Sequence, residues 1–295
     1  MLPLDLVTLT TLMVRTKGDP NIRIGLIDGP VFTKHPDLDT TNLNQVGNKV
    51  PFVCAKQDSA ACIHGTFIAG VLSAKRGSVA PAICPGSTLL VRSIFVETAS
   101  NVHSTPSANP AELVSALYEC MDAGACILNL SLGLAPTESM HQKALTEALD
   151  AALKRNVLVV AAAGNQSRFD SSPITRHPWV IPVTGCDLNG RLSSESNFGR
   201  SIGRHGLRAP ASNITSLSSV GKPLSFSGTS AAVPFVTGAI ALLWAQYPKA
   251  NAAQIKLAIT QSATRRRTGI VPPLLDAQAA YLTLTQDARK MDEER

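Results

Sequence analysis

The stretch SFSGTSAAVP, from Ser225 to Pro234, joins a short polar segment to a long apolar one. Residues 225–228 are mostly small and polar, and an apolar run from Ala231 to Trp244 follows Ser230 at once. This pattern predicts a loop that leads into a buried helix. Ser230 would then lie among the unpaired N–H groups at the positive end of the helix, where developing negative charge is favoured. An isolated Gly-Thr-Ser, however, is more often only a helix cap.

The rest of the chain alternates between short apolar segments and helical patterns. Buried strands are predicted at residues 21–27, 88–96, 125–131, 156–163 and 179–184, and residues 31–61 are expected to be irregular. Pro182 would place the last of these strands at an edge or a bulge. Helices are predicted after Ile63, over 109–124 and 139–155, after Ser230, from Asn251, and over 277–285. Apolar strands that alternate with helices predict an α/β fold with a mostly parallel central sheet and helices on both faces.

Composition and charge restrict the classes of function open to this chain. Its 295 residues, 44% hydrophobic and 16% charged, are typical of a globular protein with a sizeable core. The net charge is +6, but the densest basic run, Arg265 to Arg267, is not interleaved with aromatic residues, so we expect no nucleic-acid binding. No apolar run approaches the ~18 residues that span a membrane, so we expect no membrane association. The apolar segment Met1 to Val14 has no basic residue before it, unlike a secretory signal, and a cytoplasmic location is expected.

The six cysteines form no Cys-x-x-Cys pair and show no spacing with histidine that suggests zinc. In a reducing compartment, six free and mostly buried thiols are expected. Cys54 and Cys62 bracket a short loop, however, and could form a disulfide where the compartment allowed it. We therefore expect neither a metal nor a cofactor.

Several polar residues are predicted at the carboxyl ends of strands, where open α/β sheets bind their ligands. Asp28 follows the first predicted strand, Ser131-Leu132-Gly133 ends the third, and Gly164-Asn165 closes the fourth. His64 begins a helical segment and is followed directly by a glycine. Each of these residues, taken alone, is more often a turn former or a helix cap.

Together, these residues match the requirements of acyl transfer. The hydroxyl of a serine such as Ser230 is a poor nucleophile and needs a base of near-neutral pKa, which His64 would supply. A buried Asp28 would hold that histidine in one tautomer and stabilise its charged form. A backbone N–H and the side chain of Asn165 would donate hydrogen bonds to the oxyanion. The set is therefore far more specific than any of its members.

The same segments resemble those of the subtilases, the subtilisin-like serine peptidases, in which Asp, His and Ser follow in this order. The likeness extends over residues 21–284. It rests on the segments Ile27-Asp28-Gly29, His64-Gly65-Thr66-x-x-Ala69-Gly70, Asn129-Leu130-Ser131-Leu132-Gly133, Ala161-Ala162-Ala163-Gly164-Asn165 and Gly228-Thr229-Ser230-x-Ala232-x-Pro234. It implies a subtilisin-like three-layer peptidase domain over residues 21–285, between a short N-terminal extension (1–20) and a charged C-terminal tail (286–295).

The resemblance also implies a role for each position. Asp28, His64 and Ser230 would form the catalytic triad, and Asn165 would form the oxyanion hole with the backbone N–H of Ser230. The substrate would bind along Ser131, Leu132, Gly133, Ala162, Ala163 and Gly164. Acidic loops like the calcium sites of the family are not evident, which again implies no metal.

A narrower likeness involves Lys17 to Arg23, Ile27 to Val31, and His35-Pro36. These segments resemble the subtilases of cyanobactin-type pathways, which cut a leader from a ribosomally made precursor peptide. The expected partner is therefore a peptide or protein substrate, with a small precursor peptide as one candidate. The segment Ser131-Leu132-Gly133 instead resembles general subtilisins, and Ala231 stands where the family usually has Met.

Three alternatives stay open on the sequence. A general intracellular protease would share the chemistry, and a catalytically silent peptide-binding subtilase would share the scaffold. An esterase of the α/β-hydrolase type would require Gly-x-Ser-x-Gly, whereas residues 228–232 read Gly-Thr-Ser-Ala-Ala. About twenty residues precede the first predicted strand, too few for an independent domain. We therefore expect Met1 to Val14 to pack on the domain, and the chain to fold unaided and to be active without self-processing.

Overall fold

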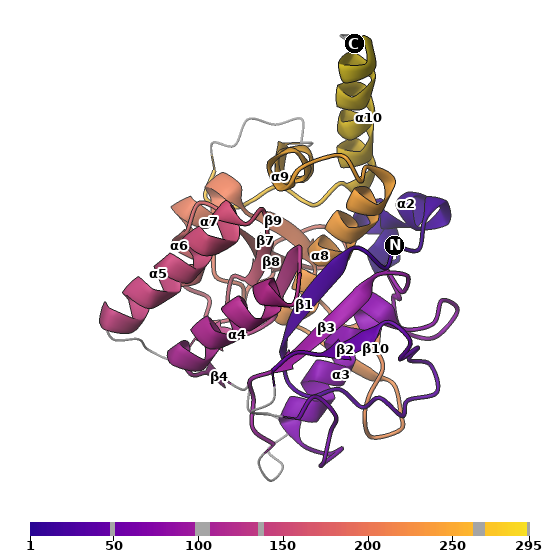
Figure 1. Ribbon diagram of the computed structural model, residues 1–295, viewed down its shortest axis with the longest axis vertical. Helices are drawn as coiled ribbons and strands as arrows, with labels where there is room; N and C mark the ends of the chain where they lie inside the picture. Colours follow the sequence, from indigo (N-terminus) through magenta and orange to yellow (C-terminus); the bar gives the residue numbers. More distant parts are fainter. Residues whose placement is uncertain (48–50, 98–106, 135–138, 262–268, 294–295) are drawn as a thin grey trace.

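The core of the protein is a seven-stranded parallel sheet (Figure 1). The computed structural model describes residues 1–47, 51–97, 107–134, 139–261 and 269–293, so the basic run at 265–267 lies outside the described residues. The strands, in their order across the sheet, are β2 (Leu43–Gln45), β3 (Thr88–Ser93), β1 (Arg23–Asp28), β5 (Ile127–Leu130), β7 (Leu158–Ala162), β8 (Val180–Cys186) and β9 (Leu207–Pro210). Every neighbouring pair runs parallel, which confirms the predicted fold class.

Helices cover both faces of this sheet (Figure 1). On one face α4 (Pro110–Asp122) and α5 (Ser139–Lys154) pack together over β1, β3 and β7. On the other, α8 (Thr229–Gln246) packs on β5, β7, β8 and β9 and against α3 (Ala60–Ser73). The remaining helices are α1 (Pro3–Leu6), α2 (Leu9–Arg15), α6 (Pro173–Arg176), α7 (Arg200–His205), α9 (Ala252–Gln261) and α10 (Ala277–Glu293). Two small sheets pair β4 (Ser107–Ala108) with β6 (Gly133–Leu134), and β10 (Ile214–Ser216) with β11 (Leu224–Phe226).

The expectation that Pro182 marks an edge or a bulge is wrong, because β8 lies between β7 and β9. The Val183 carbonyl accepts a hydrogen bond from the Ala163 N–H, just beyond β7. The backbone groups of the preceding residue, Pro182, therefore point away from β7, toward the side on which β9 lies. Pairing with β9 begins only at Val183, opposite Leu207. The missing N–H of proline therefore falls where β8 has no partner strand yet.

Two further expectations about local structure fail. The segment 31–61, predicted to be irregular, contains the short edge strand β2, whose three residues are too few to show a period. The last helix, predicted to end at Thr285, continues to Glu293 (Figure 1). Residues 286–293 contain neither Gly nor Pro and are mostly good helix formers, so nothing in this segment stops the helix.

Helix α8 is the apolar centre of the helical layer that contains α3 and α8. It is long and apolar enough to cross a membrane by composition alone, with a mean hydropathy of 1.3, so the expectation that no apolar run approaches this length is wrong. However, 83% of the helix is buried inside the protein. Its apolar character is therefore that of a core helix packed on four strands.

The N-terminal helices pack on the domain, as expected for this segment. Val7, Leu9 and Leu12 are fully buried in the same core as the sheet. The Thr8 hydroxyl donates to the Asp276 carboxylate at 2.8 Å, beside the start of α10. Residues far apart in the sequence are thereby joined at one end of the molecule.

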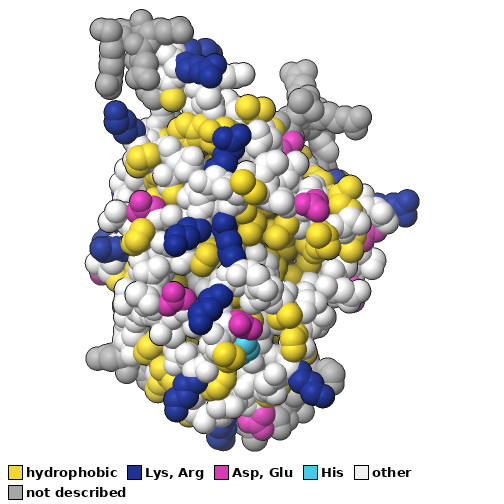
Figure 2. Space-filling view, turned by 90° about the vertical axis from the view of Figure 1, so that its right-hand side faces the viewer, with side chains coloured by type: hydrophobic (Ala, Val, Ile, Leu, Met, Phe, Trp, Pro, Cys, Tyr) yellow, Lys and Arg dark blue, Asp and Glu magenta, His cyan; other side chains and the backbone are white. Residues whose placement is uncertain are grey.

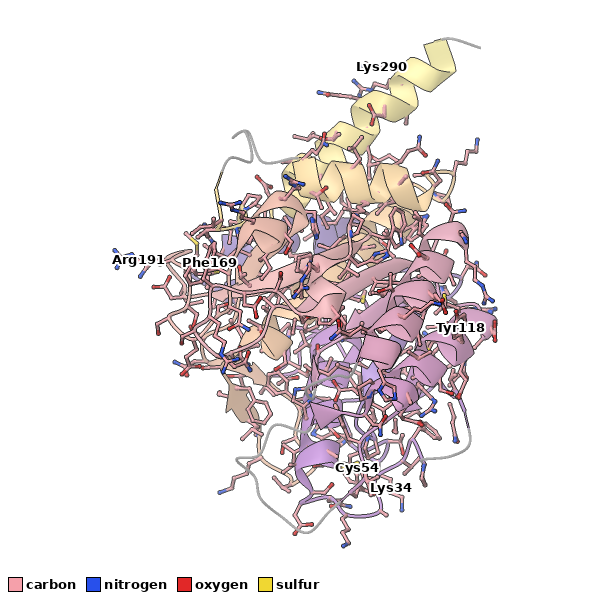
Figure 3. All side chains as sticks on the ribbon, turned by 90° about the vertical axis from the view of Figure 1, so that its left-hand side faces the viewer. Lys34, Cys54, Tyr118, Phe169, Arg191 and Lys290 are labelled. Carbon is pink, nitrogen blue, oxygen red and sulfur yellow. A yellow bond between two sulfur atoms is a disulfide. The ribbon has the colours of Figure 1, made fainter. Side chains whose placement is uncertain are left out.

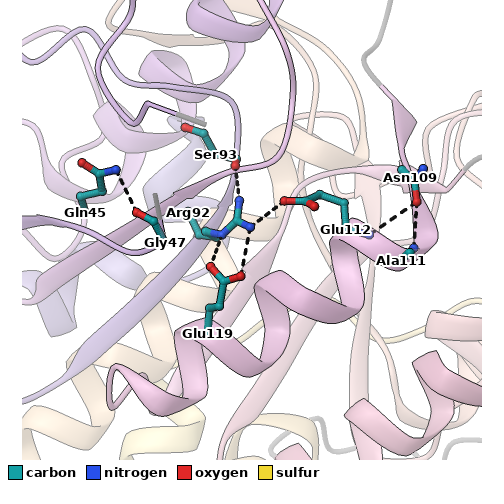
Figure 4. Close-up of polar contacts among 8 residues, drawn as sticks. All are labelled: Gln45, Gly47, Arg92, Ser93, Asn109, Ala111, Glu112 and Glu119. Atoms are coloured by element: carbon teal, nitrogen blue, oxygen red, sulfur yellow. Dashed lines mark hydrogen bonds and ion pairs between the residues drawn. The ribbon is translucent and has the colours of Figure 1, made fainter. Parts of the chain in front are cut away.

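Among the residues that the structure describes, the largest fully buried side chain is that of Arg92, which lies between β3 and α4 (Figure 4). Its Nε donates to Glu119 at 2.7 Å and its Nη2 to Glu112 at 2.6 Å, while Nη1 donates to the Ser93 carbonyl. Both carboxylates lie on α4 and raise the pKa of Arg92 against the effect of its burial. These two ion pairs therefore fix α4 on the sheet.

We expect Arg92→Ala to lower the free energy of unfolding by about 3 kcal/mol, because it leaves two partly buried carboxylates without their partner. The matched control is Arg155→Ala, whose ion pair with Asp122 lies at the surface and should contribute less than about 1 kcal/mol. Urea denaturation of both variants measures the difference. Equal losses would contradict a structural role for the buried network.

The structure joins Cys54 and Cys62 in a disulfide, so the default of six free thiols is wrong for this pair (Figure 3). Their Cα atoms lie 5.6 Å apart, within the span that a disulfide bridges. The other four cysteines are free: Cys84, Cys120, Cys126 and Cys186. Burial raises the pKa of the first two to about 12 and of the last two to about 11, which makes these thiols unreactive.

Candidate active site

The predicted site residues gather at one edge of the sheet. Asp28 is the last residue of β1, Ser131 follows the end of β5, and Asn165 follows β7. These three strands are neighbours at the centre of the sheet, so their carboxyl ends meet. Ser230 is the second residue of α8, which packs against two of them. The fold therefore brings together residues from four separate segments.

Asp28 and His64 form a hydrogen-bonded pair. The Asp28 carboxylate is fully buried, and its Oδ1 lies 2.7 Å from Nδ1 of His64. The same oxygen accepts the backbone N–H of Gly29 at 2.7 Å. Two glycines allow the turn after β1 to approach α3 closely enough for this bond. A Cβ on Gly29 would lie 2.0 Å from the Ala61 carbonyl oxygen, and one on Gly65 would lie 2.4 Å from the Gly29 carbonyl oxygen. Backbone contact between the turn and α3 thus sets His64 on Asp28.

Two opposing influences act on the pKa of His64. Burial is the largest single one and disfavours the charged imidazolium, while the charge of Asp28 and its hydrogen bond favour it. The two effects of Asp28 together outweigh burial, so the pKa of His64 lies above its usual value of 6.5. This is the direction expected for a histidine that takes up a proton during a reaction.

Ser230 is tied to the end of β5 by a chain of buried polar groups. The Ser131 hydroxyl donates to the Ser230 carbonyl at 3.0 Å and accepts from Asn129 at 2.9 Å. Asn129 in turn accepts from Thr237, about two helical turns further along α8, at 2.8 Å. These bonds fix both the position and the rotation of the first turns of the helix.

Ser230 and His64 lie on packed elements without a direct bond. Their helices α8 and α3 pack together, and the Phe226 ring, shortly before Ser230, lies 6.3 Å from the His64 ring. Within the described part of the chain, Nε2 of His64 is buried and makes no hydrogen bond. Bonds between catalytic groups are often long without substrate and tighten in the substrate complex. Asp28 and His64 are therefore in contact here, and Ser230 lies on the helix that packs against the helix of His64.

Asn165 is oriented by the residue before Ser230. Its Oδ1 accepts two hydrogen bonds from Thr229, from the backbone N–H and from the hydroxyl, both at 2.9 Å. The amide nitrogen lies beside Gly228, where an added Cβ would be 3.0 Å away. Because its oxygen is engaged, the side chain presents an N–H donor next to the start of α8. The sequence around Thr229 is typical of a helix cap, and it gave no sign that this residue would bond to Asn165.

A pocket of about 290 Å³ lies beside these residues. Five of the predicted substrate-binding residues line it: Leu132, Gly133, Ala162, Ala163 and Gly164. The sixth, Ser131, is not in its lining and contacts Ser230 instead. The remaining lining residues were missed by the sequence analysis: Gln166, Arg168, Asp170, Ser171, Ser172, Ile174 and Asn197. They come from segments with no hydrophobic period, which leave no signal in a single sequence.

The described residues contain one group of side chains with the donor atoms of a metal site. Cys54, Cys62 and Glu97 hold their donor atoms within 4.8 Å of one another. The two sulfurs are joined to each other. The Glu97 carboxylate accepts hydrogen bonds from the Ala55 N–H at 2.9 Å and from the Ser59 hydroxyl at 3.2 Å. These donors are engaged in closing the loop before α3.

On the face shown in Figure 2, Lys and Arg side chains are dispersed among apolar and polar ones. Acidic side chains are interspersed with them on the same face. This face therefore presents no continuous basic stripe of the kind that follows a nucleic-acid backbone.

Known proteins resemble this chain over most of its length. The subtilase family matches residues 19–280. Subtilisin DY of Bacillus licheniformis is 28% identical over 250 residues, which cover 83% of this chain and 84% of subtilisin DY. A thermophilic serine proteinase of Bacillus sp. strain AK1 is 31% identical over 253 residues, covering 85% of this chain and 58% of that protein.

Solved structures give the same result at the level of the fold. The prenylagaramide maturation protease PagA has a TM-score of 0.80 at 25% identity and covers 94% of this chain and 98% of its own. The patellamide maturation protease PatA has a TM-score of 0.74 at 26% identity and covers 91% and 98%. The chain therefore belongs to the subtilase family and is a serine-type endopeptidase.

Proposed function

We propose that this endopeptidase works through Asp28, His64 and Ser230 by way of an acyl-enzyme. The Ser230 hydroxyl attacks the substrate carbonyl while His64 takes up its proton, and a tetrahedral oxyanion forms. Asn165 and the Ser230 backbone N–H donate hydrogen bonds to that oxyanion. When the intermediate collapses, His64 gives the proton to the leaving amine, and water then releases the acyl group by the same steps.

The observation that carries this proposal is the 2.7 Å bond between Asp28 and His64. Burial of the Asp28 carboxylate beside an imidazole has a desolvation cost, and groups buried at such a cost are typical of functional sites. Asp28 holds Nδ1 of the ring, which leaves Nε2 to exchange a proton with Ser230. The pair lies at the strand ends where Ser230, Asn165 and the 290 Å³ pocket also lie.

The natural substrate that we propose is a ribosomally made precursor peptide, from which the enzyme removes the leader. Support comes from PagA and PatA, which are described as maturation proteases of prenylagaramide and patellamide. The substrate would bind as an extended strand along Ser131-Leu132-Gly133, with one side chain in the 290 Å³ pocket. The segment β6, which starts at Gly133, is already in strand conformation.

A synthetic peptide encoded by a small open reading frame beside the gene tests this substrate. A leader protease should cut it at one bond, with kcat/KM at least about 100-fold above that for peptides from denatured casein. Mass spectrometry of the products gives the bond. Cleavage of casein at many bonds with equal kcat/KM would favour the alternative, a general intracellular protease.

The pH dependence of kcat/KM should report His64. The general base must be neutral, so activity should rise with pH and reach half its maximum above pH 6.5, because the pKa of His64 is raised. Below that pH the imidazole is protonated and cannot accept the Ser230 proton. A pH profile between 5 and 9 with a fluorogenic peptide measures it. A flat profile would contradict the role of His64.

Asn165→Ala should lower kcat by ~10²- to 10³-fold with little change in KM, since its hydrogen bond is strongest to the oxyanion. The substitution removes an exposed side chain whose bonds are with Thr229. Steady-state kinetics with the same peptide separate kcat from KM. An increase in KM with unchanged kcat would make Asn165 a ground-state binding residue.

A further inference from the structure

The loop that carries Asn165 is held in place by a side chain from a later segment of the chain. We name residues 163–168 the oxyanion loop. Its partner is Asn197, which lies between β8 and α7 and is 9% exposed. The sequence around Asn197 predicts no role for it, and the proposed chemistry does not use it directly.

Asn197 makes five hydrogen bonds to the oxyanion loop. Its Oδ1 accepts the backbone N–H groups of Gln166 and Arg168, both at 3.0 Å. Its Nδ2 donates to the Ala163 carbonyl at 3.1 Å and to Oε1 of Gln166 at 2.7 Å. Its backbone N–H donates to the Gly164 carbonyl at 2.8 Å. The side-chain oxygen of Asn197 thus accepts two hydrogen bonds and its amide nitrogen donates two, all with residues on either side of Asn165.

The backbone of this loop needs such support. Gly164 has a φ of 103° and Ser167 a φ of 54°, both in the left-handed region. A serine in that region is strained and persists only where its surroundings hold it. Asn197 bonds to the residues on both sides of Ser167. A Cβ on Gly164 would lie 2.4 Å from Nδ2 of Asn197, so the amide packs directly on the loop.

Two residues therefore position Asn165, and each holds a different part of it. Thr229 holds its side-chain oxygen, which sets the direction of the amide nitrogen. Asn197 holds the backbone before and after it, which sets where that nitrogen lies. Catalysis by a preorganised donor depends on both, and an error of about 1 Å in such a group can cost 10²-fold in rate.

We propose that Asn197 is a positioning residue of the oxyanion hole, which places Asn165 for the transition state. The inference rests on the proposed role of Asn165. Asn197→Ala should lower kcat about 10- to 100-fold and change KM by less than about 3-fold. Near wild-type kcat in a folded Asn197→Ala protein would overturn the proposal.

A double-mutant cycle distinguishes positioning from a general structural effect. If Asn197 acts through Asn165, Asn197→Ala should change kcat less than about 3-fold in an Asn165→Ala background. Equal losses in both backgrounds would mean that Asn197 acts elsewhere and would overturn the proposal, while the proposed function stands. Failure of Asn165→Ala itself to lower kcat would instead remove the oxyanion role of Asn165 from the proposed function, and this inference with it.

Two further variants distinguish an effect on catalysis from a failure to fold. Asn251→Ala is the matched control: its side chain accepts the Gln254 N–H at 2.9 Å at the start of α9, and its loss should lower Tm but leave kcat within about 2-fold. Asn197→Asp keeps an oxygen to accept the backbone of Gln166 and Arg168 and loses the donor to Ala163. If the alanine variant does not fold, Asn197→Asp should still lower kcat in wild type and not in Asn165→Ala. Additive effects would again overturn the proposal.

Discussion

Ser230→Ala is expected to lower kcat for peptide hydrolysis by ~10³-fold or more and to leave the fold intact. The substitution removes the nucleophile, while the hydrogen bond that the Ser131 hydroxyl gives to the Ser230 carbonyl does not involve the lost atom. Helix α8 should therefore keep its position. Turnover of a fluorogenic peptide and the Tm of both proteins measure the two effects.

The matched control for this prediction is Ser225→Ala. Ser225 is exposed on β11 and its hydroxyl pairs with that of Thr215 at 2.8 Å, so its loss should change kcat by less than about 2-fold. Substantial turnover by Ser230→Ala, with Ser225→Ala unchanged, would refute Ser230 as the nucleophile.

Asp28→Asn should be almost as damaging, with a loss in kcat of about 10⁴-fold. The carboxylate is fully buried and accepts at 2.7 Å from His64. An amide nitrogen at that point would donate to Nδ1 and hold the ring in the wrong tautomer, with its proton on Nε2. The imidazolium would also lose the negative charge that raises the pKa of His64.

The pH profile of Asp28→Asn provides a second readout. The half-maximum of its residual activity should move to lower pH than in the wild type, because burial then acts on the pKa of His64 unopposed by the aspartate charge. A loss in kcat without a shift in the profile would show that Asp28 supports the fold and not the charge on His64.

The central strands and the site positions could be predicted because strong local signals mark them. Strands such as β5 and β7 are buried on both faces and read as apolar runs. Asp28 and Asn165 stand directly after such runs, and parallel strands bring their ends to one edge. The segment before Ser230 was recognisable since a polar loop there meets a core helix.

The remaining features depend on contacts that no local pattern encodes. The edge strand β2 has three residues and exists because β3 pairs with it. The Cys54–Cys62 bridge depends on the meeting of two loop ends, as well as on the compartment. Asn197 acquires its bonds only when the segment after β8 folds back on the oxyanion loop. Such tertiary contacts decide the walls of the pocket, and with them the choice of substrate.

Labelling with a fluorophosphonate tests the central claim, that Ser230 is a nucleophile activated by His64 and Asp28. The reagent forms a covalent bond with a serine only where a base removes its proton, so the test needs no knowledge of the substrate. Intact mass should show one label per chain, peptide mapping should place it on Ser230, and Ser230→Ala and Asp28→Asn should remain unlabelled on the same timescale. Absence of label from the folded wild type, or a label on another residue, would contradict the account.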